Sequence, residues 1–237
     1  MNTNSNTYTF IFAIVLVTIV AGLLAFTAIK LKPLQEDNVR NEKMQSILTS
    51  IGVNESRDHA GEVFNQYIKK QLALKIDGTV DPEVDAFTIN LKNEIKKDPK
   101  EQRYPLYIAE NQGKKMYIVP LFGKGLWDDI WGYIALDDDK NTIAGAVFDH
   151  KGETPGLGAE IRESWFEKQF TGKKMFTNPD DFTINNFVSV YTVKGGAKPD
   201  DVHGVNAISG GTVTSTKLSK MIKERMQRYL PYFQKNK

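Results

Sequence analysis

The sequence predicts an α+β domain, a mostly antiparallel sheet with flanking helices, preceded by one N-terminal transmembrane helix. Three observations support this fold class. An uncharged apolar segment opens the chain, β-branched and aromatic runs bounded by turn residues fill its middle, and apolar residues at helical spacing close it. With 237 residues, 41% of them hydrophobic and 25% charged, the chain is long enough to bury a substantial core and is not disordered.

The first element is an apolar helix. The segment from Tyr8 to Ile29 carries no charge and, at roughly 20 residues, is long enough to cross a bilayer. A cleaved signal peptide is the competing interpretation, but no Lys or Arg precedes the segment and no clear Ala-x-Ala site follows it. We therefore expect residues 8–29 to be a transmembrane anchor. Lys30 and Lys32 follow it, and positive charge alone weakly favours a cytoplasmic domain.

Between the anchor and the middle of the chain the pattern is mixed. Pro33 is expected to interrupt the helix, and residues 34–51 are expected to form a separate amphipathic helix. A second helical pattern surrounds Phe64 and leads into a strand at 72–76. Residues 82–100 are rich in charge and weak in periodicity, so we expect a surface excursion there.

The second half of the chain is rich in strands. Runs that favour strands lie at 116–122, 131–136, 142–148 and 187–193, and helices are expected at 159–170 and 216–229. This order of elements favours an antiparallel sheet.

Composition excludes several kinds of chemistry. Cysteine is absent, so this chain has no disulfide, no thiolate nucleophile and no cysteine ligand for an iron-sulfur cluster. The net charge is +2 and the basic residues are scattered, so no nucleic-acid partner is expected. The three histidines, His59, His150 and His203, lack ligand spacing, and no metal site is expected.

An acidic run at 137–141 resembles the start of a calcium-binding loop. The turn glycine of such a loop is missing, because Thr142 stands there, and Phe148 occupies the place of the bidentate glutamate. We therefore expect a solvated hairpin turn.

A glycine-rich stretch at 206–215 precedes the last helical pattern. Backbone N–H groups at its glycines and the positive end of the helix dipole favour an anion, and hydroxyl groups add donors. Thr214, Ser215 or Thr216 is expected to be the N-cap. No Gly-Lys-Ser/Thr follows, so a nucleoside triphosphate is not the expected ligand. The alternative is a plain strand-to-helix turn in which Thr212 is a solvated hydroxyl.

A second glycine-rich stretch, Glu-Thr-Pro-Gly-Leu-Gly-Ala-Glu at 153–160, also precedes a helical pattern. Its glycines would let the backbone approach a flat ring closely, and Leu157 could cover one ring face. The alternative is a turn that only initiates a helix.

Three motifs carry a resemblance to a known family. The stretch from Asn206 to Thr212 resembles the covalent flavin-attachment motif Asp-x-x-Ser/Thr-Gly-Ala/Gly-Thr of membrane redox complexes, with Asn206 in place of the usual Asp. Residues 153–158 resemble the second signature of the same FMN-binding domain family. Gly-Lys-Gly-Leu-Trp at 123–127, followed by Trp-Gly-Tyr at 131–133, narrows the resemblance to the C subunits of sodium-translocating NADH:quinone oxidoreductases.

The resemblance implies a cofactor and its site. FMN would be bound covalently through a phosphoester at Thr212, the last threonine of the motif, and no residue of the chain would be catalytic. Trp127 would pack close to the flavin, and Lys194 would either contact it or be exposed to solvent. The remaining cofactor-binding residues would shape the attachment turn (Ser209, Gly210 and Gly211) and line the ring (Glu153, Thr154, Leu157 and Gly158).

The resemblance also implies an organisation and a role. Residues 8–29 would be the anchor, 30–110 a membrane-proximal linker with the start of the soluble domain, and 111–237 the FMN-binding domain. The chain would relay electrons among the other subunits of a sodium-pumping complex in a bacterial inner membrane, with its soluble domain on the periplasmic side. A flavin transferase would install the cofactor. The alternatives are a G-type subunit of an RNF electron-transport complex and a membrane-anchored ligand-binding module without redox function.

Overall fold

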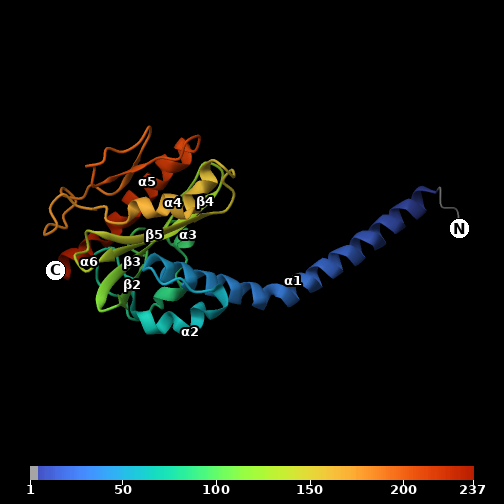
Figure 1. The fold of residues 1–237 in the computed structure, drawn as a ribbon. Coiled ribbons are helices and arrows are strands. Elements are labelled where there is room, and N and C mark those ends of the chain that lie inside the picture. Colours follow the sequence, from blue (N-terminus) through green and yellow to red (C-terminus); the bar gives the residue numbers. More distant parts are fainter. Residues whose placement is uncertain (1–4) are drawn as a thin grey trace. The chain divides into compact units, whose positions relative to one another are not determined.

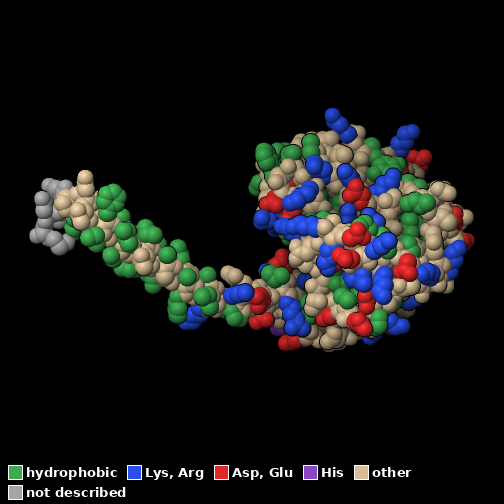
Figure 2. Space-filling model, turned by 180° about the vertical axis from the view of Figure 1, so that it is seen from behind, with side chains coloured by type: hydrophobic (Ala, Val, Ile, Leu, Met, Phe, Trp, Pro, Cys, Tyr) green, Lys and Arg blue, Asp and Glu red, His purple; other side chains and the backbone are tan. Residues whose placement is uncertain are grey.

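The computed structural model describes residues 5–237, and the chain divides into two compact units, Met1–Lys43 and Met44–Lys237. Helix α1 (Asn6–Ser50) forms residues 6–43 of the first unit, and its last turns belong to the second. Along α1, apolar side chains from Phe10 to Ile29 are exposed, as Figure 2 shows in green. Among the residues that the structure describes, α1 is the one helix long and apolar enough to cross a membrane.

Two threonine hydroxyls within the apolar segment are hydrogen-bonded inside the helix. The hydroxyl of Thr18 donates to the carbonyl of Ile14, and that of Thr27 donates to the carbonyl of Leu23, each at 2.8 Å. Such internal bonds suit a hydrocarbon environment, where no water is available as a partner. The expected interruption at Pro33 is wrong, because α1 continues through this residue. Proline removes one backbone hydrogen bond, and the helical residues on both sides outweigh that loss.

The second unit is built on a five-stranded antiparallel sheet, as expected (Figure 1). Each strand pairs with the next along the chain, so the order in the sheet is the order in the sequence. The strands are β1 (Ile68–Leu74), β2 (Tyr104–Asn111), β3 (Lys114–Lys124), β4 (Asp129–Asp137) and β5 (Ile143–His150).

Both faces of the sheet are covered. One face packs against α5 (Thr212–Met226) and the C-terminal elements η4 (Gln227–Tyr229) and α6 (Leu230–Lys235), and this side holds the larger core. The other face packs against the last turns of α1, from Met44 onward, and against α2 (Arg57–Tyr67). Neighbouring strand residues alternate between the two cores, as Leu106 and Tyr107 do.

Two expectations for the first half of the second unit need correction. Strand β2, which lies between β1 and β3, was not expected; it begins at a Tyr-Pro pair and is buried on both faces, so it lacks polar alternation. Residues 82–100 are not only a surface excursion. They contain η1 (Ala86–Thr88) and α3 (Leu91–Glu94), and Ala86 and Leu91 are buried.

The expected helix at 159–170 is broken into three short pieces. These are η2 (Gly158–Arg162), α4 (Ser164–Glu167) and η3 (Lys168–Phe170). Phe166 and Phe170 still reach the core, where the rings of Phe148 and Phe170 lie 4.9 Å apart edge to face, whereas Trp165 is exposed. The segment therefore buries its apolar residues through three short helical turns and not through one continuous helix.

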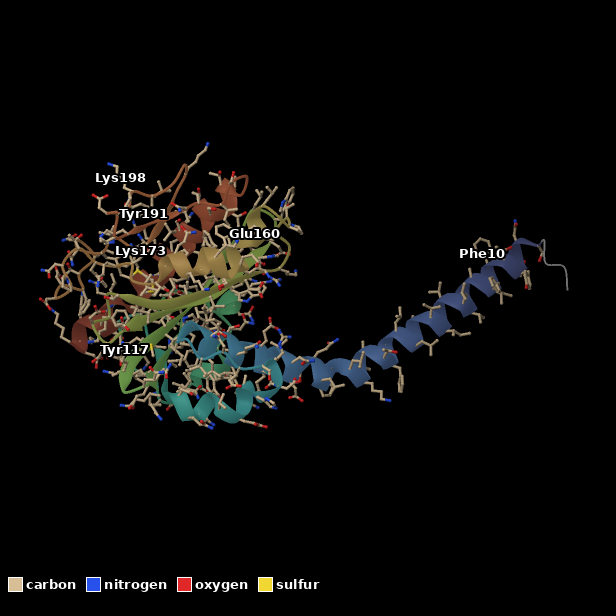
Figure 3. The ribbon with its side chains drawn as sticks, in the orientation of Figure 1. Phe10, Tyr117, Glu160, Lys173, Tyr191 and Lys198 are labelled. Carbon is tan, nitrogen blue, oxygen red and sulfur yellow. The ribbon has the colours of Figure 1, made fainter. Side chains whose placement is uncertain are left out.

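The expected strand at 187–193 is also shorter than its pattern. Only β6 (Tyr191–Val193) is a strand, and it pairs in parallel with β7 (Gly204–Asn206). Ser189 has φ 74°, a left-handed conformation that ends an extended run. Tyr191 lies in this outer part of the unit with Lys173 and Lys198 (Figure 3).

The acidic run between β4 and β5 forms the expected hairpin turn, but the turn is not fully solvated, because Lys140 and Asn141 are buried. Asp139 Oδ1 accepts hydrogen bonds from the backbone N–H groups of Asn141 and Thr142, at 2.9 and 2.8 Å. Lys140 takes a positive φ of 55° at the tip. The carboxylate of Asp139 thus closes the turn.

Candidate flavin site

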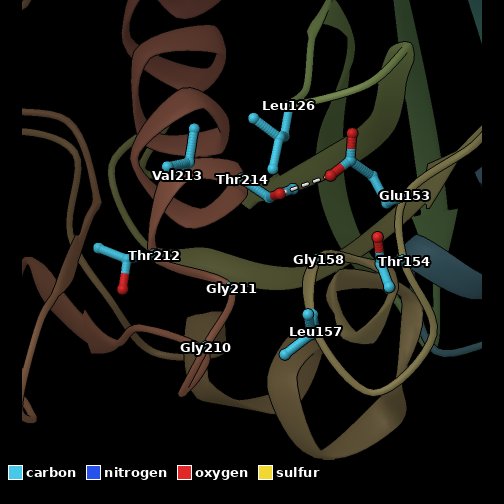
Figure 4. A pocket seen from close by; sticks show the side chains of 10 residues that line it. All are labelled: Leu126, Glu153, Thr154, Leu157, Gly158, Gly210, Gly211, Thr212, Val213 and Thr214. Carbon is cyan, nitrogen blue, oxygen red and sulfur yellow. Dashed lines mark hydrogen bonds between the residues drawn. The ribbon is translucent and has the colours of Figure 1, made fainter.

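The two glycine-rich stretches face each other across a pocket of about 100 Å³. One stretch follows β5, and the other leads into α5 (Figure 4). Of the residues expected to bind a cofactor, most line this pocket, whereas Ser209, Trp127 and Lys194 do not. The lining residues are Leu126, Glu153, Thr154, Leu157, Gly158, Gly210, Gly211, Thr212, Val213 and Thr214.

Glycine allows the two stretches to approach closely. A Cβ atom on Gly210 would lie 2.5 Å from Cδ2 of Leu157, and Gly210 has φ +73°. A Cβ atom on Gly211 would lie 3.1 Å from the carbonyl carbon of Leu157. Glycine at both positions therefore favours this close approach, through a positive φ at Gly210 and through space at Gly211, and Leu157 forms one wall of the pocket.

Thr212 is the first residue of α5, and Gly211 is its N-cap. The expected N-cap at Thr214, Ser215 or Thr216 is wrong. The glycine turn enters the helix directly, and Ser215 stabilises that turn instead: its Oγ accepts from the N–H of Ile208 at 3.1 Å and donates to the carbonyl of Gly211 at 2.9 Å. Helix α5 thus begins at the pocket.

The Thr212 side chain is half-buried, and its hydroxyl makes no hydrogen bond within residues 5–237. The first N–H groups of a helix have no partner inside the helix, and the helix dipole adds positive potential there. Thr212 therefore combines an unengaged hydroxyl with a place that favours an anion.

Glu153 is 4% exposed and lies in the wall of the pocket. Its Oε1 accepts from the backbone N–H of Trp127 at 2.9 Å, and its Oε2 accepts from the Thr214 hydroxyl at 2.5 Å (Figure 4). The ring of Trp127 is 70% exposed, so this residue is linked to the pocket through its backbone.

Leu126 lies on a loop whose end is fixed by ion pairs to Asp129. Lys92 Nζ lies 2.6 Å from Oδ2 of Asp129, and Lys124 forms an ion pair with the other oxygen. Burial raises the pKa of Asp129, but hydrogen bonds from the two lysines outweigh it, and the pKa lies below its usual value. An ionised Asp129 therefore fixes the end of the loop.

Asn206 supports the outer side of the attachment turn. Its Oδ1 accepts from the backbone N–H of Ala197 at 2.8 Å, and its own N–H donates to Oε1 of Gln169 at 2.9 Å. The first bond closes the turn that contains Lys194, whose side chain is exposed. The role that the structure gives to Asn206 needs only an acceptor oxygen.

Three lining residues were not expected: Leu126, Val213 and Thr214. Leu126 lies within the Gly-Lys-Gly-Leu-Trp motif at 123–127. Its apolar side chain next to Trp127 could have indicated a place in the pocket. Val213 could have been predicted, because it follows Thr212 in the first turn of α5. Thr214 could not have been predicted, because its hydrogen-bond partner, Glu153, lies 61 residues away along the chain and no local pattern indicates this pairing.

An antiparallel sheet with two facing glycine loops and an unengaged hydroxyl at a helix N-terminus defines a domain suited to a phosphate-bearing cofactor. The model of the FMN-binding domain family matches residues 125–227, which contain both loops. The comparisons with whole proteins then identify the family: the chain belongs to the C subunits of Na(+)-translocating NADH-quinone reductase, as the motifs predicted.

The relatives cover most of the chain. The C subunit of Vibrio anguillarum is 31% identical over 86% of this chain and 84% of its own length. The crystal structure of the C subunit from Parabacteroides distasonis is 40% identical, with a TM-score of 0.77, and covers 85% of this chain and 96% of that one. The structure of Shewanella oneidensis NqrC is 26% identical, with a TM-score of 0.69, and covers 83% and 98%.

Proposed function

We propose that this chain carries FMN in a phosphoester bond to Thr212 and relays electrons within a Na(+)-translocating NADH-quinone reductase complex. The observation that carries the proposal is the hydroxyl of Thr212, which stands unengaged at the first position of α5 beside a glycine turn. The family of the chain supports the proposal, because its relatives are subunits of such a complex.

The residues of the pocket fit an FMN group. The amino-terminal N–H groups of α5 and its dipole favour the phosphate. The apolar side chains of Leu126, Leu157 and Val213 are 48%, 41% and 47% exposed, so they offer a surface to a flat ring and leave it accessible. Bound FMN would supply reversible electron transfer.

Attachment requires help from another protein. A threonine hydroxyl is a weak nucleophile at neutral pH, and Thr212 has no hydrogen-bonded base within residues 5–237. We propose that a flavin transferase activates it and uses FAD as donor. The bond from Thr212 Oγ1 to the phosphorus of the FMN half forms, the pyrophosphate P–O bond breaks, and AMP leaves with that oxygen. The hydroxyl proton passes to the transferase.

The proposed location rests on the family to which the chain belongs and on its apolar N-terminal helix. Residues 8–29 anchor the chain in the bacterial inner membrane, and the second unit lies on the periplasmic side, where the transferase acts. A reporter fused after Lys237 tests this topology. Activity of a reporter that works only in the periplasm supports it, and activity of a cytoplasmic reporter contradicts it.

Co-expression with a flavin transferase tests the attachment. Flavin fluorescence in the denatured protein band is expected for the wild type and for Thr216→Ala, and none is expected for Thr212→Ala. Thr216 is a matched control, because it is an exposed threonine in the first turns of α5. A wild-type band without fluorescence would favour a binding module without redox function.

A further inference from the structure

Glu153 joins three separate segments of the pocket. One carboxylate oxygen holds the loop at 123–128 through the N–H of Trp127, and the other holds the first turn of α5 through the hydroxyl of Thr214. Its own backbone N–H donates to Nδ1 of His150, at the end of β5, at 3.2 Å. Glu153 is therefore tied to the end of β5 through its backbone N–H and to both walls of the pocket through its carboxylate.

The surrounding packing is built to admit this carboxylate. A Cβ atom on Gly125 would collide with Oε1 of Glu153. A Cβ atom on Gly158 would lie 2.5 Å from Oε2 of Glu153 and would also collide with Oγ1 of Thr214. Neither glycine has a positive φ, so close approach to the carboxylate, and not backbone strain, explains both.

The hydrogen bond between Glu153 and Thr214 constrains the helical turn that carries the proposed attachment residue, Thr212. Thr214 is 1% exposed and lies two residues beyond Thr212 in the same turn of α5. At 2.5 Å this hydrogen bond is short, and a buried hydrogen bond is electrostatically stronger than one in water. It therefore fixes the direction in which the first turn of α5 presents its other side chains.

We infer that Glu153 and Thr214 are positioning residues for flavin attachment: their hydrogen bond holds the first turn of α5, and with it the Thr212 hydroxyl, in a fixed place at the rim of the pocket before FMN arrives. This inference rests on the proposed attachment at Thr212. It gives Glu153 a role that does not require contact with the flavin, because both of its oxygens are already engaged by the protein. Misplacing a reacting group by about 1 Å can slow a reaction by roughly a hundredfold.

Two substitutions at one position test the hydrogen bond. Thr214→Val keeps the shape of the side chain and removes the donor, whereas Thr214→Ser keeps the donor. The initial rate of flavin incorporation is measured with purified full-length protein in detergent, a flavin transferase, FAD and magnesium. We expect Thr214→Val to lower the rate about tenfold or more, and Thr214→Ser to stay within about twofold of the wild type. Thr216→Val, at an exposed position of the same helix, is expected to match the wild type.

The outcomes separate this inference from the proposed attachment. A wild-type rate in Thr214→Val, or equal slowing in Thr214→Ser, overturns the positioning role while attachment stands. Absence of incorporation in the wild type, or incorporation in Thr212→Ala, overturns the attachment itself.

A second variant decides the matter if Thr214→Val does not fold. The double variant Glu153→Gln/Thr214→Val removes the hydrogen bond between the two side chains, and its amide oxygen can still accept from the N–H of Trp127. A lower incorporation rate in a folded double variant supports the inference, and an unchanged rate overturns it. A thermal unfolding midpoint near that of the wild type shows that the variant is folded.

Discussion

Gly210 and Leu157 lie in contact although they come from different glycine-rich loops: a Cβ atom on Gly210 would lie 2.5 Å from Cδ2 of Leu157. The contact joins the loop after β5 to the turn before α5, and both loops line the same pocket. The close approach is possible only because Gly210 has no side chain.

Gly210→Ala is therefore expected to destabilise the protein through two effects. Its φ of +73° costs an alanine about 1 kcal/mol. The Leu157 side chain, which is 41% exposed, must also move aside, and this adds up to about 1 kcal/mol. Gly156→Ala is the matched control, because Gly156 has φ +75° and nothing within 4 Å of its Cβ position. Urea unfolding of the full-length protein in detergent measures both. Equal losses in the two variants would contradict the contact, and Leu157→Ala is expected to relieve part of the loss in Gly210→Ala.

Asn206→Asp is expected to keep the attachment turn intact. The residue is needed as an acceptor for the N–H of Ala197, and a carboxylate accepts at least as well as an amide oxygen. Asn206→Ala removes the acceptor and is expected to slow flavin incorporation several-fold, by loosening the turn. Incorporation rates with a flavin transferase check both variants. A slower rate in Asn206→Asp than in Asn206→Ala would show that the amide group has another role.

The stability of the protein is expected to fall as pH rises toward neutrality because of Glu167. Burial raises the pKa of Glu167 from 4.5 to about 7, and the N–H of Phe148, which donates to Oε1 at 2.7 Å, opposes the rise only in part. The folded state therefore holds the proton more tightly than the unfolded state. Its stabilising effect is complete below about pH 4.5 and is lost as pH rises through about 7.

The size of this effect is on the order of 2 kcal/mol after allowance for partial exposure of the carboxyl group. Glu167→Gln keeps an acceptor for Phe148 and does not ionise. We expect the variant to exceed the wild type in stability at pH 8 and to lose that advantage at pH 5. Unfolding free energies measured across this range check the difference, and parallel pH profiles would exclude Glu167 as the source.

Tyr229→Phe is expected to cost roughly 1–3 kcal/mol, because the buried carbonyl of Pro105 loses its side-chain donor. The Tyr229 hydroxyl donates to this carbonyl at 2.9 Å and joins η4 to β2. Tyr191→Phe is the control: its hydroxyl donates to Asp201 at 3.2 Å on the exposed side of β6, and its loss is expected to cost less than about 0.5 kcal/mol. Similar losses in both variants would contradict the importance of burial.

The sequence predicted the fold class because β3, β4 and β5 carry strong strand patterns between turn residues. It did not predict β2, since burial on both faces removes the alternation that marks a strand. It also gave no warning that Ser189 would adopt a positive φ and shorten the strand that ends at Val193. Such outcomes depend on contacts between distant segments, which local periodicity does not contain.

The same distinction applies to the site. The glycines and Thr212 could be recognised from their motifs, because glycine is the residue that allows the backbone to approach another group closely. The hydrogen bond between Glu153 and Thr214 could not, because it exists only after β5 and α5 are brought together. Sequence therefore indicates which residues form the pocket, and packing determines how they are held.

Intact-mass analysis of the protein, purified from membranes of cells that contain a flavin transferase, tests the central claim most directly. The account predicts an increase equal to the mass of FMN less one water, with the added mass on the peptide that contains Thr212. An unmodified polypeptide, or the same mass on a different residue, would contradict it.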